Sequence, residues 1–168
     1  KGMVIIMANK KAAVIMGSDS DLPVVEKAIN TLKELEVPYE VHVYSAHRTP
    51  EQAKDFSASA RENGFGVIIA AAGMAGAIAA NTTLPVIGIP IKSANLGGME
   101  ALLSTVQMPS GIPVATVAID GAANAALLAA EMIAIEDEEL YKRLVKKRSD
   151  DTAKVLSKNA AVEEKYNS

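Results

Sequence analysis

The residues best suited to chemistry are six in a row, Ser45 to Pro50, which read SAHRTP. His47 is one of only two histidines in the chain. An imidazole has an ordinary pKa of about 6.5, so it can move protons near neutral pH. Arg48 presents a rigid fork of N–H donors that suits a phosphate group, and Thr49 can cap a helix that begins at Pro50. The hexapeptide is therefore a candidate active-site loop, although a histidine and an arginine on an ordinary surface loop would give the same pattern.

A second candidate is the segment Gly17 to Asp21, which reads GSDSD and joins an apolar run to a helical pattern. Backbone amides at a helix N-terminus bind anions, and phosphates above all. Since carboxylates repel phosphate, Ser18 and the amides would contact a phosphate, whereas Asp21 would accept hydrogen bonds from sugar hydroxyls. Plain helix capping by Ser20 or Asp21 is the alternative explanation of this motif.

The remaining polar residues give weaker indications. His42 lies within a strand pattern two places from Tyr44, where a structural role is expected. The run Ala70 to Asn81 predicts a turn of small residues that leaves room for a ligand or for another backbone. Lys92 and Ser93 precede paired glycines but include no evident nucleophile. No serine is paired with a base, and no carboxylate cluster has the spacing of metal ligands, so hydrolase and metalloenzyme chemistry have little support.

Composition excludes several other classes of protein. A net charge of −3 gives no electrostatic reason to expect nucleic acid or an anionic membrane as a partner. The absence of cysteine excludes disulfides and fits a reducing compartment. Residues 1–11 contain an apolar patch too short for a signal peptide or a membrane span, so they are predicted to form a flexible leader. The protein is expected to be soluble and cytoplasmic.

Alternating apolar runs and helical patterns set the expected architecture. Strands are predicted within 12–16, 37–46, 65–73, 84–91 and 112–119, and helices within 22–35, 49–64, 99–107 and 121–135. Strands that alternate with helices pair in parallel through right-handed crossovers, which predicts an α/β fold, a three-layer α/β/α sandwich. Ligands bind beyond the carboxyl ends of such strands. The segments 17–21, 45–50, 71–75 and 91–98 should therefore converge on one edge of the sheet.

The expected organisation is one catalytic domain, residues 12–136, followed by a charged helical tail, residues 137–168. With 168 residues, the chain can bury a real core. The tail has only a thin apolar stripe, Leu140, Leu144, Val145, Val155 and Leu156. A stripe of this width is expected to pack on the surface of the domain or on a neighbouring subunit.

Taken together, several strings resemble the N5-carboxyaminoimidazole ribonucleotide mutase family of purine biosynthesis, the PurE family. They are MGSDSD, SAHRTP, VIIAAAGMA, LPVIGIPIKSANLGG, LLSTVQMPSGIPVATVAI and GAANAALLAA, and they run in order from about Ala12 to Ala134. The resemblance implies a flavodoxin-like parallel sheet of about five strands, and a homo-octamer with active sites near subunit boundaries. It also implies a small-molecule substrate and no metal or organic cofactor.

The resemblance further implies an isomerase reaction, in which a carboxyl group leaves an exocyclic nitrogen and reappears on ring carbon 4 of an aminoimidazole ribonucleotide. His47 would be the general acid and base. Ser18, Asp21 and Arg48 match the family's ribonucleotide-binding positions. Ser45, Ala46, Gly73 and Ser93 are weaker matches and would line the pocket. A pocket lined by Gly and Ala turns suits the retention of carbon dioxide beside the ring.

One loop departs from the family pattern. In relatives, the loop after the third strand reads Gly-Ala-Gly, then two small residues, then Ala-His-Leu. Here Ala71 replaces the first glycine, and about four residues are missing between Ala75 and Gly76. Either the protein lacks them, or a mobile segment is missing from the sequence as it stands. The second explanation is favoured because loops that cover a substrate are often disordered, and the mass of the intact protein distinguishes the two.

Two other functions remain open at this level. The sister enzyme makes the same product from aminoimidazole ribonucleotide and free carbon dioxide, and it shares the fold and most motifs. A non-enzymatic nucleotide-binding or receiver-like module on a flavodoxin-like sheet belongs to a different class. A receiver would require an aspartate at the end of the third strand, where VIIAAAG has none, and a flavin binder would require more aromatic residues.

Overall fold

A parallel sheet of five strands forms the centre of the computed structural model, which describes residues 9–94 and 96–167. The strands are β1 (Lys11–Met16), β2 (Tyr39–Val43), β3 (Phe65–Ala71), β4 (Val86–Ile89) and β5 (Ala115–Thr116). They lie in the order β2-β1-β3-β4-β5, and every neighbouring pair is parallel. The predicted parallel sheet of about five strands is confirmed.

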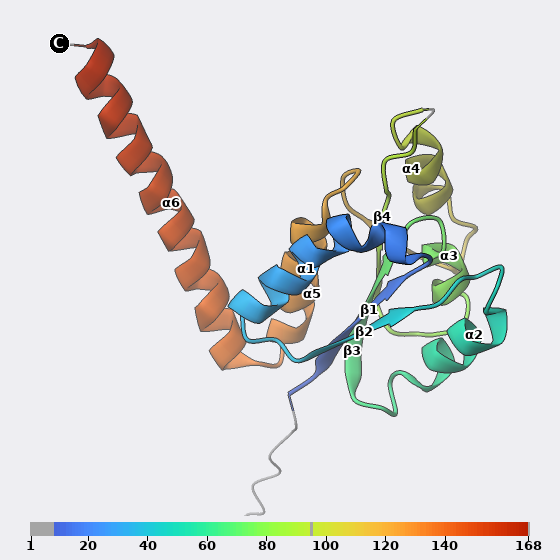
Figure 1. Cartoon of the computed structure of the whole chain (residues 1–168). Coiled ribbons are helices and arrows are strands. Elements are labelled where there is room, and N and C mark those ends of the chain that lie inside the picture. Colours follow the sequence, from blue (N-terminus) through green and yellow to red (C-terminus); the bar gives the residue numbers. More distant parts are fainter. Residues whose placement is uncertain (1–8, 95, 168) are drawn as a thin grey trace, which may run out of the picture.

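Helices cover both faces of this sheet (Figure 1). On one face lie α1 (Leu22–Glu34) and α5 (Ala122–Ala134), and on the other lie α2 (Pro50–Ser59) and α3 (Ala75–Ala79). The helix α4 (Met99–Val106) packs beside β4 and β5. Because side chains alternate along a strand, each face of the sheet has its own apolar core. This confirms the three-layer α/β/α sandwich.

The alanine-rich helix α5 packs closely against α1 and against the sheet. Six of its residues are buried, and these are Ala122, Ala125, Ala126, Ala129, Ala130 and Ile133. Alanine side chains let a helix backbone approach its neighbours closely, because there is little bulk to keep it away. The close approach expected from the small residues of this segment is therefore present.

Two local predictions differ from the structure. The segment predicted as a strand over 112–119 is a strand only at Ala115–Thr116, since β5 lies at the sheet edge and Pro113 has no N–H to donate to a ladder. The segment predicted as a small-residue turn, 70–81, contains the short helix α3. Neither difference changes the prediction that the segments 17–21, 45–50, 71–75 and 91–98 follow the carboxyl ends of strands.

The tail forms one long helix, α6 (Glu138–Tyr166). Asp137 caps it, because its carboxylate accepts a hydrogen bond from the Leu140 amide at 3.0 Å. Leu140 and Leu144 are buried against the domain. Arg143 Nε donates to the Leu35 carbonyl at 2.7 Å, which fixes the first turns of α6 beside the end of α1. Farther along, α6 leaves the body of the molecule (Figure 1).

The apolar residues of the distal part of α6 are little covered by the residues that the structure describes. Val155, Leu156, Val162 and Tyr166 are all more than half exposed. Among the residues that the structure describes, no helix is both long enough and apolar enough to cross a membrane. Residues 1–8 of the predicted leader lie outside the described residues, and Lys11 is already the first residue of β1.

Candidate active site

The sheet order places the predicted site loops together. The strand β1 lies between β2 and β3, so the chain leaves β1 toward one side of the sheet and later strands are added on the other. Ligands bind at such a switch point, outside the carboxyl ends of the strands. The segments 17–21, 44–49 and 72–74 follow β1, β2 and β3 directly, and they meet at this edge.

The segment Gly17 to Asp21 forms a single 3₁₀ turn before α1. Ser18 is extended, and its Oγ accepts hydrogen bonds from the Ser20 amide at 3.3 Å and from the Ser20 hydroxyl at 2.9 Å. The prediction that Ser20 or Asp21 caps α1 is wrong, because Asp21 stands at the cap position without a capping hydrogen bond. Ser18 caps the 3₁₀ turn instead, so the Asp21 carboxylate is free of this task.

Partial burial raises the pKa of the Asp21 carboxyl. A backbone hydrogen bond to Ser18 acts in the opposite direction, and the negative charge of Asp19 adds a smaller upward shift. Asp21 therefore keeps its proton to a higher pH than an exposed aspartate does. A carboxyl group perturbed by burial at a sheet edge is a common property of functional sites.

The hexapeptide SAHRTP folds into a closed turn between β2 and α2. The Ser45 amide donates to Thr49 Oγ1 at 2.8 Å, and the Thr49 amide donates to the Ser45 carbonyl at 2.8 Å. The Arg48 amide donates to Ser45 Oγ at 3.1 Å. Thr49 precedes α2 as predicted, but its hydroxyl does not cap the helix, because it closes the turn with Ser45.

Arg48 connects the two main candidate segments. Its Nη2 donates to the Gly17 carbonyl at 3.5 Å, across 31 residues of sequence. Both His47 and Arg48 are exposed, and Ser18 is partly exposed. The structure therefore brings Ser18, His47 and Arg48 to one open edge, where a ligand from solvent can reach them.

The weaker candidates lie around this edge. Gly73 is exposed after β3, and the Met74 sulfur lies 3.8 Å from where a Cβ on Gly17 would stand. The Ser93 hydroxyl lowers the pKa of the Glu100 carboxyl, yet its buried Oγ makes no hydrogen bond of good geometry within the described chain. Ala46 packs against the core on the α2 side, which makes it a support of the loop.

Asp120 is a residue that the sequence interpretation missed. Its Oδ1 accepts a hydrogen bond from the Lys92 amide at 3.0 Å, which ties the loop after β4 to the loop after β5. Asp120 adopts a positive φ of 58°, a conformation that costs energy for a residue with a side chain. Its place just beyond the carboxyl end of the fifth strand was the signal that could have identified it.

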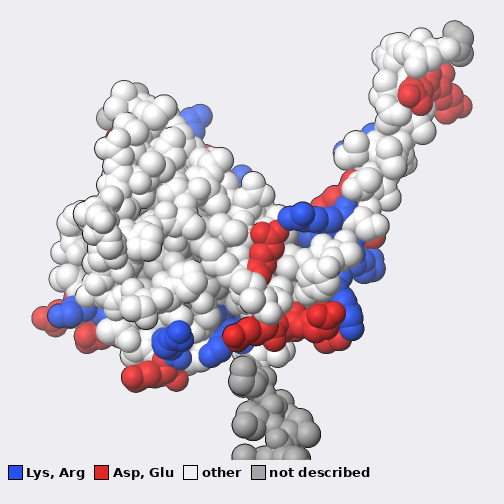
Figure 2. All heavy atoms as spheres, turned by 180° about the vertical axis from the view of Figure 1, so that it is seen from behind, with Lys and Arg blue, Asp and Glu red and all other residues white. Residues whose placement is uncertain are grey.

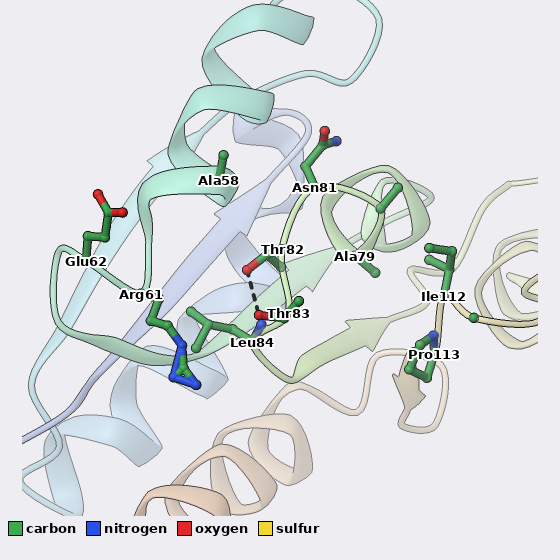
Figure 3. A pocket seen from close by; sticks show the side chains of 12 residues that line it. Ala58, Arg61, Glu62, Ala79, Asn81, Thr82, Thr83, Leu84, Ile112 and Pro113 are labelled. Atoms are coloured by element: carbon green, nitrogen blue, oxygen red, sulfur yellow. Dashed lines mark hydrogen bonds between the residues drawn. The ribbon is translucent and has the colours of Figure 1, made fainter.

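One cavity of the structure lies away from this edge. It has a volume of about 710 Å³ and is lined by Arg61, Asn81, Thr82, Thr83 and residues around Pro113 (Figure 3). These residues precede β4 and β5, so the cavity lies at the amino ends of the strands. Within residues 9–94 and 96–167, no group of three or more His, Asp or Glu side chains is arranged to hold a metal ion.

Comparisons with known proteins agree with this fold. The model of the family described as AIR carboxylase matches residues 11–154. A protein of Pyrococcus horikoshii named N5-carboxyaminoimidazole ribonucleotide mutase is 53% identical in an alignment of 168 positions. The alignment covers 96% of this chain and 95% of the relative. A protein of Vigna aconitifolia named phosphoribosylaminoimidazole carboxylase, chloroplastic, is 46% identical, over 89% of this chain and 28% of the relative.

Solved structures give the same result for the fold. The crystal structure of PurE from Treponema denticola superposes with a TM-score of 0.80 at 25% sequence identity, and covers 92% of this chain and 99% of that one. The structure of a variant from the same organism gives a TM-score of 0.82. The shared fold extends over almost the whole of the solved chains.

The alignment with the Pyrococcus relative also bears on the loop that departs from the pattern. It spans 168 positions but includes only 96% of the 168 residues of this chain, so several of its positions have no residue here. In the structure, the chain passes directly from β3 through Ala72, with a φ of 64°, to α3. The gap expected between Ala75 and Gly76 stays a prediction.

Proposed function

Because the chain belongs to the AIR carboxylase family, we propose that it converts N5-carboxyaminoimidazole ribonucleotide to 4-carboxy-5-aminoimidazole ribonucleotide. It is an enzyme, an isomerase of purine biosynthesis like the relatives with which it shares half of its residues. The observation that carries the proposal for the site is the contact between Arg48 Nη2 and the Gly17 carbonyl, which joins the SAHRTP turn to the turn after β1. His47 directly precedes Arg48 in the SAHRTP turn and is exposed.

The ribonucleotide is held at this edge by hydrogen bonds and by the positive charge of Arg48. Ser18 and the Arg48 guanidinium bind the phosphate, since a guanidinium makes two parallel hydrogen bonds to phosphate oxygens. The Asp21 carboxylate, which has no capping bond, accepts hydrogen bonds from ribose hydroxyls. Ser45, Ala46, Gly73 and Ser93 line the remainder of the pocket. Ser93 belongs to the loop after β4, at the same edge of the sheet.

His47 moves the single proton that the reaction requires. The bond between the exocyclic nitrogen and the carboxyl carbon breaks, carbon dioxide is released, and the imidazolium of His47 donates a proton to that nitrogen. Carbon 4 of the ring then attacks carbon dioxide, and the imidazole removes the proton from carbon 4. The proton taken up equals the proton given, so the enzyme returns to its starting state. Retention of carbon dioxide beside the ring makes the second step effectively intramolecular.

The alternative reaction is direct carboxylation of aminoimidazole ribonucleotide by free carbon dioxide. The higher identity to the Pyrococcus mutase than to the plant carboxylase favours the isomerase. Each substrate is to be supplied with and without added bicarbonate, and product formation is to be followed. Turnover of the N5-carboxylated substrate without dependence on bicarbonate is expected. Turnover only of aminoimidazole ribonucleotide, and only with bicarbonate, would identify the carboxylase instead.

We also propose that the protein is a homo-octamer, as its resemblance implied. The chain has 17 Lys and Arg and 20 Asp and Glu, yet residues 63–130 contain only three of these, Lys92, Glu100 and Asp120. Figure 2 shows a broad face of the body without charge, whereas charges gather at its lower rim and on α6. Interface cores are depleted of charge, so this segregation supports contacts between copies.

The face of α4 is the strongest candidate for such a contact. Met99, Leu103 and Val106 recur at helical spacing, and each is about half exposed, at 48% to 53%. Light scattering is expected to give a mass near eight chains for the natural protein, and a smaller mass for Leu103→Glu. A monomer at micromolar concentration would contradict the proposal. The cytoplasmic location expected from the sequence stays a prediction.

A further inference from the structure

Half of the Phe and Tyr residues of the chain gather at one place beside the SAHRTP turn. The chain has only two Phe, four Tyr and no Trp. Both Phe and one Tyr form, with His42, an aromatic cluster of His42, Tyr44, Phe56 and Phe65. The rings of His42 and Tyr44 are stacked with centroids 5.2 Å apart and planes 7° apart. Phe56 contacts both of these rings, at 4.7 Å and 5.8 Å.

The cluster is also connected by polar contacts. The Tyr44 hydroxyl lies 3.4 Å from His42 Nδ1, and His42 Nε2 lies 3.4 Å from the Glu40 carboxylate. Lys11 Nζ donates to the same carboxylate at 2.7 Å and lies 4.4 Å above the Phe65 ring. Lys11 holds the pKa of Glu40 below its ordinary value, with a smaller contribution from His42. His42 is therefore held on both of its nitrogens, in agreement with the structural role expected for it.

The aromatic cluster joins the two elements that flank the SAHRTP turn. His42 belongs to β2, and Tyr44 follows β2 and precedes Ser45 directly. Phe56 belongs to α2, the helix that begins after Thr49. The cluster thus clamps together the two elements that flank the turn. Its ring contacts fix the distance between β2 and α2, and therefore between the two ends of the turn.

The turn itself is stiff, so its position depends on these ends. Hydrogen bonds between Ser45 and Thr49 close the turn in both directions, and the Arg48 amide is bound to Ser45 Oγ. Outside the turn, the Tyr44 amide donates to the Met16 carbonyl at 3.0 Å. A single hydrogen bond at one end of the turn fixes that end of the backbone but leaves the turn free to tilt about it. Movement of the aromatic cluster would carry His47 and Arg48 with it as one unit.

We propose that Tyr44 and Phe56 are positioning residues, whose packed rings set the place of His47 relative to the turn after β1. The proposal rests on the function proposed above for His47. We assign this role to the stacking of the Tyr44 ring on His42 and its contact with Phe56, and not to the 3.4 Å contact of the Tyr44 hydroxyl with His42 Nδ1. A shift of about 1 Å in a catalytic group can cost about 100-fold in rate, so loss of the ring affects kcat.

The test compares three variants of the full chain. Tyr44→Leu removes the ring, and kcat is expected to fall about 10- to 100-fold. Tyr44→Phe keeps the ring and is expected to restore most of this loss. Tyr39→Leu is the matched control, since Tyr39 lies on the same strand but packs on the opposite face, against the core beneath α1 and α5. It is expected to lower the unfolding midpoint much as Tyr44→Leu does, with kcat unchanged.

A second readout reports the position of His47 directly. Because the chain contains two histidines, ¹³C-labelled imidazole gives two sets of NMR signals. The His47 signal is expected to shift or broaden in Tyr44→Leu and to keep its position in Tyr44→Phe and Tyr39→Leu. If Tyr44→Leu does not fold, Phe56→Leu tests the same clamp from the helix side, with the same expected losses.

The other outcomes contradict the proposal in distinguishable ways. An unchanged kcat and an unchanged His47 signal in Tyr44→Leu would overturn the positioning role, whatever His47 does. A loss in Tyr44→Phe as large as that in Tyr44→Leu would assign the effect to the hydroxyl and overturn the role of the ring. If the His47 signal moves in Tyr44→Leu while His47→Asn remains active, the function proposed for His47 fails and the clamp stands.

Discussion

Replacement of His47 by Asn is expected to abolish turnover. General acid–base catalysis by one positioned group contributes about 100- to 10,000-fold, and His47 is the only imidazole in the SAHRTP turn. Asn keeps a polar side chain of similar reach but has no proton to exchange near neutral pH. The measurement is kcat with saturating substrate, together with product affinity by calorimetry.

Binding and assembly are expected to persist in this variant. The imidazole of His47 is exposed and makes no hydrogen bond to the described residues, so its loss leaves the turn closed by Ser45 and Thr49. Glu51→Gln, at an exposed position in the first turn of α2, controls for a polar substitution near the turn. Turnover of His47→Asn close to that of Glu51→Gln would refute the proton-transfer role.

Replacement of Arg48 by Ala has the second-largest expected effect. Hydrogen bonds to charged groups contribute about 1.5–3 kcal/mol, which corresponds to a loss of affinity of about 10- to 150-fold. The loss is expected in Kd and KM, since Arg48 binds the phosphate, which does not react. Among the described residues, the Arg48 side chain makes one weak hydrogen bond, to the Gly17 carbonyl at 3.5 Å, so little of the role of this side chain is structural.

Two further variants separate geometry from charge. Arg48→Lys keeps the positive charge but loses the planar fork, so it is expected to recover only part of the affinity. Lys54→Ala removes a positive charge from the exposed face of α2, and its affinity is expected to match that of the natural protein. An unchanged Kd in Arg48→Ala would make Arg48 a bystander and would move the phosphate elsewhere.

The layers of the fold could be predicted from the sequence because the signal is local. Buried parallel strands are apolar on both faces, and β1 and β3 are almost entirely buried. The strand order was not predicted, since nothing local states that β1 lies between β2 and β3. The convergence of 17–21 and 45–50 followed from a general rule about parallel sheets, and the contact from Arg48 to Gly17 agrees with it.

The helix caps were predicted less well, because a polar side chain near a helix N-terminus has several hydrogen-bond partners within reach. Thr49 and Asp21 both occupy helix cap positions, but neither caps. Thr49 instead bonds across four residues to Ser45, a contact that depends on how the turn closes. The aromatic cluster was missed for a related reason. The alternation in YEVHVY showed which residues share a face of β2, but not that Phe56 of α2 and Phe65 of β3 would meet them there.

The open site of a single chain bears on the proposed chemistry. His47 and Arg48 are exposed, whereas carbon dioxide must stay beside the ring between the two steps. The helix α4, with its exposed apolar residues, starts close to Ser93, because the Ser93 hydroxyl lies beside the Glu100 carboxyl in its first turn. A neighbouring copy on this surface would help to exclude water from the site. Assembly and catalysis are then linked, and a variant that dissociates the copies is expected to lose activity as well.

The account depends on the place of one imidazole relative to one ring, and a crystal structure of the protein with bound product measures this directly. A nitrogen of His47 is expected within hydrogen-bond reach, about 2.6–3.2 Å, of the exocyclic nitrogen or the new carboxyl group, with the phosphate between Ser18 and Arg48. An imidazole that faces bulk solvent, with the ribonucleotide bound away from the turn after β1, would contradict the account.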